Sequence, residues 1–256
     1  MNFSKNFKYY FNPILFLLVG FVFAGNFYSN LNNNSFSWLG FLISLITLHY
    51  LCNLVHIASH NSLTRPIWLN DLISRICCIP ALAFTHIDFK ITHLEHHKHT
   101  TDPVLDPDWK ITNTGSVFLL PFRIVFYKDL FFWKFCIKNK KIKYLREYVF
   151  DRLVQIITVF AVFSNFDFAF KFYWILPLFI VGILNAAFLY FYPHYEDNFE
   201  RFLRSRNRFI AWRPIQKIYL FTVDVSRELH RQHHLKPTKN YYYFPEIWII
   251  KRKSED

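Results

Sequence analysis

The chain has 256 residues and a formal net charge of +12, and it is 53% hydrophobic and 21% aromatic. This composition excludes an ordinary soluble domain, which carries fewer apolar residues and more glycine. The positive charge does not require nucleic acid as a partner, because the sequence has no nucleic-acid-binding motif and basic segments such as Lys138–Glu147 suit anionic lipid headgroups.

The N-terminal part of the chain predicts two membrane-spanning helices. No Lys, Arg, Asp or Glu occurs between Tyr9 and Thr64, and a spanning helix needs about 20 mostly apolar residues. We therefore expect spans at residues 11–28 and 36–55. A cleaved signal peptide is the alternative for the first run, but the second run follows so closely that a retained anchor fits better.

Two further spans are expected toward the other end. Residues 172–193 are free of charge and long enough to cross a bilayer. Residues 153–166 are short for a span, and we expect them to be extended by their flanks. Residues 76–87 and 111–122 are apolar but shorter still, and each contains a proline, which indicates interfacial or buried segments.

Basic residues lie almost entirely on one side of this four-span arrangement. That side holds residues 1–10, 56–152 and 194–256, which carry 29 of the 30 Lys and Arg residues. The positive-inside rule then places both termini and the long central segment in the cytoplasm. The expected fold is an all-α membrane protein with about four transmembrane helices, interfacial helices and a cytoplasmic cap, forming one domain over residues 1–256.

Eight of the twelve histidines fall into three clusters on the expected cytoplasmic side, in HIASH, HLEHH and HRQHH: His56, His60, His93, His96, His97, His230, His233 and His234. Residues three or four apart share a helix face, so each cluster points its imidazoles in one direction. Eight imidazoles exceed the four ligands of a closed zinc site and match two metal ions with open positions, which favours iron. His194, just after the last span, is a candidate ninth ligand.

The three clusters resemble the histidine boxes of the integral-membrane fatty acid desaturase family. The matching stretches are HIASHNSL, HLEHHKHTTDPVLDPD and ELHRQHHLKPTKNYYYFPE, in the family's order and with its arrangement of spans. The same superfamily includes acyl hydroxylases and carotenoid ketolases and hydroxylases. Ile57 departs from the pattern, because relatives often carry an acidic residue there, and the chain lacks the His-Pro-Gly-Gly motif of a fused cytochrome.

The resemblance implies an oxidoreductase with a non-haem di-iron centre, held by the eight box histidines and His194, and with no catalytic side chain beyond that centre. It implies two iron ions, O₂ as co-substrate and an external electron donor of ferredoxin or cytochrome type. The expected substrate is an apolar acyl or isoprenoid chain that enters from the membrane lipid. The expected reaction is fatty acyl desaturation.

Carboxylates near the boxes are candidates for supporting the ligands. Metal-bound histidine usually donates its other ring N–H to a carboxylate or carbonyl. We predict this supporting role for five carboxylates: Glu95, Asp102, Asp106, Asp108 and Glu228. For His99 we expect a place beside the ligands or on the substrate side rather than a bond to the metal. A solvated loop with turn-forming prolines is the alternative for the three aspartates. His49 fits a hydrogen-bonded core histidine, and no role is assigned to His86.

Two alternatives to desaturation remain open at the level of sequence. Hydroxylation or ketolation of a fatty acyl or carotenoid substrate would use the same centre, because the outcome depends on sub-ångström placement of the substrate. A non-enzymatic membrane protein that binds metal or haem, or transports metal, is the more distant alternative. Such proteins place polar or ligating groups within their spans, and only His49 lies that deep.

Overall fold

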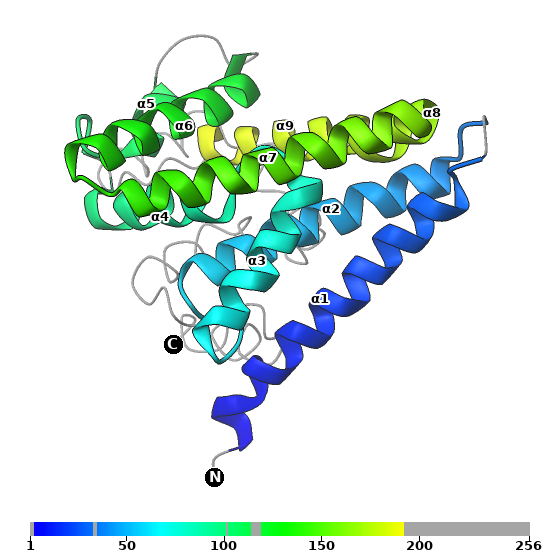
Figure 1. Cartoon of the computed structure of the whole chain (residues 1–256), viewed down its shortest axis with the longest axis horizontal. Coiled ribbons are helices and arrows are strands. Elements are labelled where there is room, and N and C mark those ends of the chain that lie inside the picture. Colours follow the sequence, from blue (N-terminus) through cyan, green and yellow to red (C-terminus); the bar gives the residue numbers. More distant parts are fainter. Residues whose placement is uncertain (1–2, 33–34, 101, 114–118, 192–256) are drawn as a thin grey trace, which may run out of the picture. The chain divides into compact units, whose positions relative to one another are not determined.

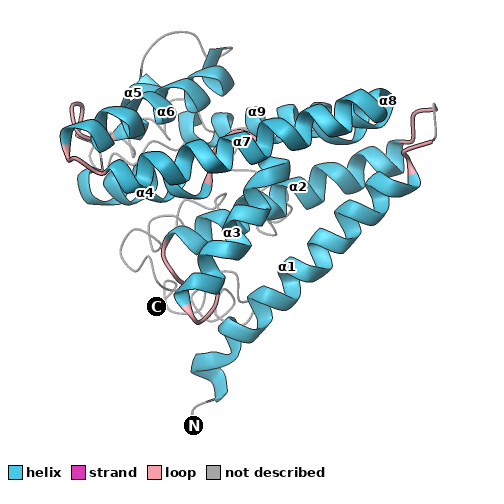
Figure 2. Cartoon of the chain, in the orientation of Figure 1, coloured by secondary structure: helices cyan, strands magenta, loops and turns pink. Residues whose placement is uncertain are grey.

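The secondary structure of the described residues is entirely helical (Figure 1, Figure 2). The computed structural model describes residues 3–32, 35–100, 102–113 and 119–191. Its elements are α1 (Phe3–Ser29), α2 (Trp38–Ser59), α3 (Ile67–Ala81), α4 (His86–His99), α5 (Pro107–Asn113), α6 (Leu120–Lys138), α7 (Ile142–Asn165), α8 (Asp167–Phe170), the π-helical turn η2 (Lys171–Ile175) and α9 (Leu176–Phe191). The prediction of an all-α fold is confirmed.

Two helices in the described ranges are long and apolar enough to cross a membrane, Trp38–Ser59 and Asp167–Asn185. Helices α3 and α4 pass the same test only as a pair that is bent by 102°. The apolar part of α1, Pro13–Ser29, is shorter than a full span. The predicted span at 153–166 is the second half of the longer helix α7. The predicted number of four spans is therefore approximate, because the described residues contain two candidate spans, or three if the bent pair counts as one.

The hairpin of α1 and α2 closes tightly around Gly40. Asn26 of α1 donates through Nδ2 to the Gly40 carbonyl at 2.9 Å and to Ser44 Oγ at 2.8 Å. A Cβ at position 40 would lie 3.0 Å from the ring of Tyr173. The small residue therefore lets α1 and η2 approach α2 closely, and side-chain amides supply hydrogen bonds between otherwise apolar helices.

The π-helical turn directs two buried aromatic side chains toward neighbouring elements. The hydroxyl oxygen of Tyr173 accepts a hydrogen bond from the backbone N–H of Ser37, just before α2, at 2.7 Å. Trp174 packs against Leu48 of α2 and donates through Nε1 to the carbonyl of Pro80 in α3 at 2.7 Å. These contacts join η2 to α2, to the residue just before it and to the end of α3.

The segment 76–87, predicted to be interfacial or buried, is divided by a sharp turn between α3 and α4. Leu82 follows the last residue of α3 and adopts a φ of 53°. Thr85 then caps α4: its side chain accepts from the Asp88 N–H at 3.3 Å, and the Asp88 carboxylate accepts from the Thr85 N–H at 2.8 Å. This capping box fixes the first turn of α4 and therefore the direction in which its later side chains point.

Helix α4 packs against the α6–α7 hairpin through an apolar face. Ile87 belongs to a buried cluster with Phe132 and Cys136 of α6 and Tyr148 of α7. Figure 1 shows α4 lying alongside this hairpin. Since successive helical residues are rotated by about 100°, the histidines of α4 fall largely on other faces, and α4 also contacts α2.

Candidate metal centre

The first histidine pair lies at the end of α2, with His56 in the last turn and His60 at the C-cap. The last carbonyls of a helix have no partner within it. Asn70 of α3, which is fully buried, donates through Nδ2 to the carbonyl of Ala58 at 2.9 Å and accepts from the Leu63 N–H at 3.0 Å. This cap holds the backbone around both histidines, so their imidazoles project together.

The second box lies on α4, where His93 and His97 are separated by one turn and share a face. The ring of Phe89, one turn earlier, stacks on His93 with centroids 5.4 Å apart and planes inclined by 20°. Thr100 ends the helix, and its hydroxyl donates to the carbonyl of His96 at 2.8 Å. The pair is thus supported on a well-terminated helix and against an aromatic ring.

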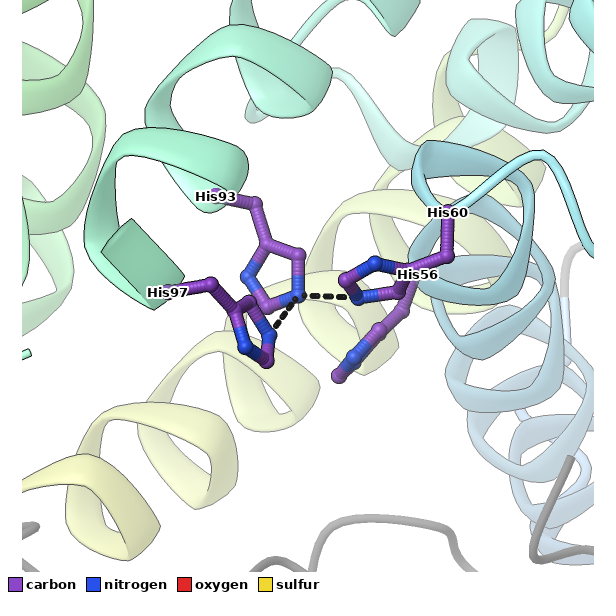
Figure 3. Close-up of side chains that lie close together, drawn as sticks. All are labelled: His56, His60, His93 and His97. Carbon is purple, nitrogen blue, oxygen red and sulfur yellow. Dashed lines mark hydrogen bonds between the residues drawn. The ribbon is translucent and has the colours of Figure 1, made fainter. Parts of the chain in front are cut away.

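His56, His60, His93 and His97 point toward one another from the two helices (Figure 3). One ligand atom from each lies within 4.8 Å of those of the others. His60 Nε2 is 2.9 Å from His93 Nε2, and His97 Nε2 is 3.0 Å from that same atom. Because His56, His60 and His93 are buried, these nitrogens converge away from bulk water.

Hydrogen bonding alone does not account for this convergence. An imidazole nitrogen presents either one N–H or one lone pair, so His93 Nε2 cannot form good hydrogen bonds with both of its neighbours. Two nitrogens that are each about 2.1 Å from one metal ion and 90° apart would lie about 3.0 Å from each other. The observed separations match that value, and the donor set therefore fits a metal ion with open positions.

His96 lies on the same helix but contacts carboxylates. Its Nδ1 is 2.8 Å from Asp106 Oδ1 and 3.8 Å from Asp108 Oδ2, and all three side chains are buried. Burial lowers the pKa of His96, but the two carboxylates outweigh it and the pKa is raised. When Asp106 accepts from Nδ1–H of a neutral ring, Nε2 keeps its lone pair for a metal ion. Lys128 Nζ lies 3.3 Å from Asp108 Oδ1 and offsets part of the negative charge.

The other predicted supports contact the loop or one another. Asp102 accepts from the N–H groups of Val104 and Leu105 at 2.8 and 2.9 Å, and these bonds lower the pKa of Asp102. Asp102 therefore shapes the turn that follows the second box. Glu95 Oε2 lies 3.6 Å from His99 Nε2, one turn along α4.

Two residues that join α3 to its neighbours carry no signal in the sequence. His86, left without a role, has Nδ1 2.7 Å from Ser74 Oγ and Nε2 3.1 Å from Asp71 Oδ1. Asp71 also accepts from Lys90 Nζ at 3.0 Å. A single histidine and the buried Asn70 have no spacing pattern that would mark them, so only the tertiary contacts reveal what they do.

The structure brings together four of the nine predicted ligands and places a fifth beside them. The ring centroid of His96 is 6.1 Å from that of His93 and 5.8 Å from that of His97. His49, predicted to be a core histidine, lies half-buried on α2 about two turns before His56. Five predicted residues lie outside the described part of the chain: His194, Glu228, His230, His233 and His234.

Comparison with known protein families shows which family the chain belongs to. The family model described as "Fatty acid desaturase" matches residues 35–256, which include all three histidine boxes. The chain belongs to the fatty acid desaturase family. Desaturases of this family are oxidoreductases that generally use iron, and the histidine cluster between α2 and α4 is able to bind a metal ion.

Part of the chain is also similar to a desaturase of known function. It is the sn-1 acyl-lipid omega-3 desaturase (ferredoxin) of Nostoc sp. (strain 36), which is 32% identical over 112 residues. The matched region covers 42% of this chain and 29% of the relative, so less than a third of the relative's length is represented. No solved structure matches the chain.

Proposed function

We propose that the protein catalyses the O₂-dependent oxidation of an apolar chain, and that the reaction is fatty acyl desaturation. The observation that carries this proposal is the convergence of His56, His60, His93 and His97 on a shared point between two helices. Membership of the desaturase family supports it. Hydroxylation or ketolation by the same centre would produce an added oxygen in place of a double bond, which the experiment below distinguishes.

The proposed cofactor is a pair of iron ions. The four converging histidines supply one set of donors, and His96, oriented by Asp106 through Nδ1, would supply a further one. The histidines of the third box and His194 would complete the ligands. Bound iron supplies the oxidation of an unactivated C–H bond with O₂ and donor electrons, which protein side chains do not perform.

The protein's own groups orient and insulate these ligands. Asp106 holds His96 in one tautomer through Nδ1, and Phe89 restricts the ring of His93 by stacking on it. Burial of His56, His60, His93 and His96 keeps bulk water from the donor atoms. Exclusion of water strengthens electrostatic interactions at the centre and limits side reactions.

The position of the histidines suits a substrate that arrives from a bilayer. His56 lies in the last turn of α2, which is a candidate membrane span. An apolar chain in the lipid can therefore reach the end of the helix that carries the ligands. We place the centre and both termini on the cytoplasmic face of a multi-pass protein, because basic residues concentrate there.

An acyl lipid as substrate and a ferredoxin-type electron donor are part of the proposal. The Nostoc relative is named as an acyl-lipid desaturase and as ferredoxin-dependent in the same description. A soluble donor on the cytoplasmic face would deliver electrons to the side of the centre opposite the lipid. No nucleic acid takes part.

The test is expression of the full chain in a host of defined lipid composition, with and without a ferredoxin system, followed by mass spectrometry of lipids and carotenoids. We expect a new double bond in fatty acyl chains that disappears in His93→Ala. Lys98→Ala is the matched control, since Lys98 is an exposed neighbour on the same helix and should leave the product unchanged.

Three results would contradict the proposal in different ways. A product that is 16 mass units heavier would favour hydroxylation over desaturation. Purified wild-type protein that binds no iron would exclude the metal mechanism altogether. Product formation that persists in His93→Ala would show that the reaction does not require the histidine cluster.

A further inference from the structure

Helix α7 contacts the turn between α3 and α4 through two side chains that bind backbone carbonyls. Arg152 donates through Nη1 to the Leu82 carbonyl at 2.7 Å. Gln155, one turn further, donates through Nε2 to the carbonyls of Cys78 at 2.7 Å and Phe84 at 2.9 Å. These carbonyls lie at the end of α3 and in the turn, where the regular hydrogen bonds of a helix run out, although the Cys78 carbonyl also accepts from the Leu82 N–H at 3.1 Å. α7 therefore caps α3 from a distance in the sequence.

The same guanidinium binds the first turn of α4. Arg152 Nη2 lies 3.3 Å from Asp88 Oδ2 and 2.9 Å from Asp129 Oδ1 of α6. Asp88 is almost completely buried and is also the acidic member of the α4 capping box. The guanidinium of Arg152 donates two further hydrogen bonds, from Nε to the Tyr148 hydroxyl at 3.3 Å and from Nη1 to Gln155 Oε1 at 3.0 Å. One side chain thus connects α3, α4, α6 and α7.

The contact between Arg152 and Asp88 affects the histidines because Asp88 lies on the same helix. Asp88 and His93 lie on one continuous helix and are five residues apart, or about 7.5 Å along its axis. A change in the tilt or rotation of the first turn therefore moves His93 and His97 as well. The separation of 2.9 Å between His60 Nε2 on α2 and His93 Nε2 on α4 leaves little room for such a shift.

We propose that Arg152 is a positioning residue for the metal centre: it sets α4 so that His93 and His97 meet His56 and His60. This inference rests on the proposed function, because it assumes that the four histidines hold a metal ion. Arg152 acts through Asp88 and the turn carbonyls, and among the described residues its hydrogen bonds and ion pairs involve none of the four converging histidines.

Arg75 provides a matched control. It lies on α3 and forms ion pairs with Glu147 and Asp151 of α7, so it joins two of the same helices. Its exposure is similar, with 27% of the side chain accessible against 17% for Arg152. Neither ion pair includes a residue of α4. Loss of Arg75 should therefore cost stability without moving the histidines.

The experiment compares Arg152→Met, Arg152→Lys and Arg75→Met in the purified full-length chain. Each protein is titrated with Co²⁺ alone, and the visible spectrum of bound Co²⁺ reports ligand geometry. We expect Arg152→Met to weaken Co²⁺ binding by roughly tenfold or more, in the range found when supports of metal ligands are removed, and to alter the spectrum. Arg152→Lys keeps the charge beside Asp88 and Asp129 but loses carbonyl contacts, so it should recover part of the affinity.

Arg75→Met should keep the wild-type affinity and spectrum while lowering the melting temperature. The proposal is overturned if Arg152→Met binds Co²⁺ as the wild type does, or if Arg75→Met reproduces its changes. If Arg152→Met does not fold, Gln155→Met removes the Cys78 and Phe84 contacts and one hydrogen bond to Arg152, and its Co²⁺ affinity must then fall below that of Arg75→Met.

Hydrogen exchange separates this inference from the proposed function. In metal-free Arg152→Met, amides of residues 89–99 should exchange faster, while those of residues 50–59 in α2 should not change. A wild-type protein that binds no Co²⁺ would refute the proposed metal centre. In that case, unchanged exchange over residues 89–99 would also refute the positioning role, and faster exchange would support it.

Discussion

The two histidine pairs of the cluster are held in place by different means. The pair on α2 depends on Asn70, which binds the Ala58 carbonyl from only 12 residues away in the sequence. The pair on α4 depends on Arg152, which binds Asp88 across 64 residues. Helix α2 is apolar and packs against α1, α3, α4 and α9, whereas α4 is a polar helix with a narrow apolar face.

A polar helix inside an apolar protein is therefore positioned differently from its apolar neighbours. Hydrophobic burial is not directional, so it orients α2 well only because neighbours surround it on several sides. α4 buries few large apolar side chains, and its orientation therefore requires directional contacts at its first turn. We expect changes on the α4 side to disturb the metal centre more than the fold, and changes near α2 to do the reverse.

The largest effect is expected from His93→Ala, which removes the nitrogen that both His60 and His97 approach. Loss of this shared donor should lower metal content and product formation by more than about 100-fold, as loss of a metal ligand exceeds the effect of loss of its support. Metal analysis of purified protein and lipid mass spectrometry measure the two quantities. Metal content that stays at the wild-type level would show that the cluster is not the binding site.

A smaller effect on the centre is expected from Asp106→Ala. Without the carboxylate, the ring of His96 loses the contact at Nδ1 that orients it. Metal affinity should fall by about 10- to 100-fold, while the melting temperature of the metal-free protein changes little. Asp106→Asn is the control, because its amide oxygen can still accept from Nδ1–H and should recover part of the affinity.

Asn70→Ala tests the α2 side of the comparison. It removes one hydrogen bond from the Ala58 carbonyl, which keeps the Asn61 N–H at 2.9 Å, and one from the Leu63 N–H. Loss of these two hydrogen bonds should lower stability by about 1–3 kcal/mol. Thermal unfolding measures this loss, and Co²⁺ titration measures the centre. If α2 is held mainly by packing, affinity should fall less in Asn70→Ala than in Arg152→Met. The opposite order would contradict the comparison.

The smallest effect is expected from Asp102→Ala, in the loop after the second box. Removal of the carboxylate should speed amide exchange at Val104 and Leu105 and leave metal affinity close to that of the wild type. The pKa of Asp102 is lowered by these two hydrogen bonds. Its contribution to loop stability is therefore present above the ordinary aspartate pKa and is lost as the pH falls through the lowered value. Protection of the Val104 and Leu105 amides, measured relative to the intrinsic exchange rate at each pH, should therefore fall as the pH falls. Protection that stays constant across that acidic range would argue against the contact.

Much of the fold and part of the site follow from local patterns. The absence of charge from Tyr9 to Thr64 predicts apolar helices, and α1 and α2 contain both predicted spans. The second half of the chain is less regular, because the span predicted at 153–166 continues into the charged first half of α7, and the last span begins with a π-helical turn. Helix ends depend on caps and neighbours as well as on composition.

Three properties follow from the order of residues alone: histidines one turn apart share a face, they belong to a desaturase-like pattern, and the chain is helical and apolar. These properties are local, because the helix repeat and side-chain hydrophobicity act over a few residues. Only the tertiary structure decided that His60 and His97 meet at His93, that Asp106 rather than Asp102 reaches His96, and that Arg152 secures the start of α4. Such contacts join residues far apart in the chain, and their geometry exists only after the helices have packed.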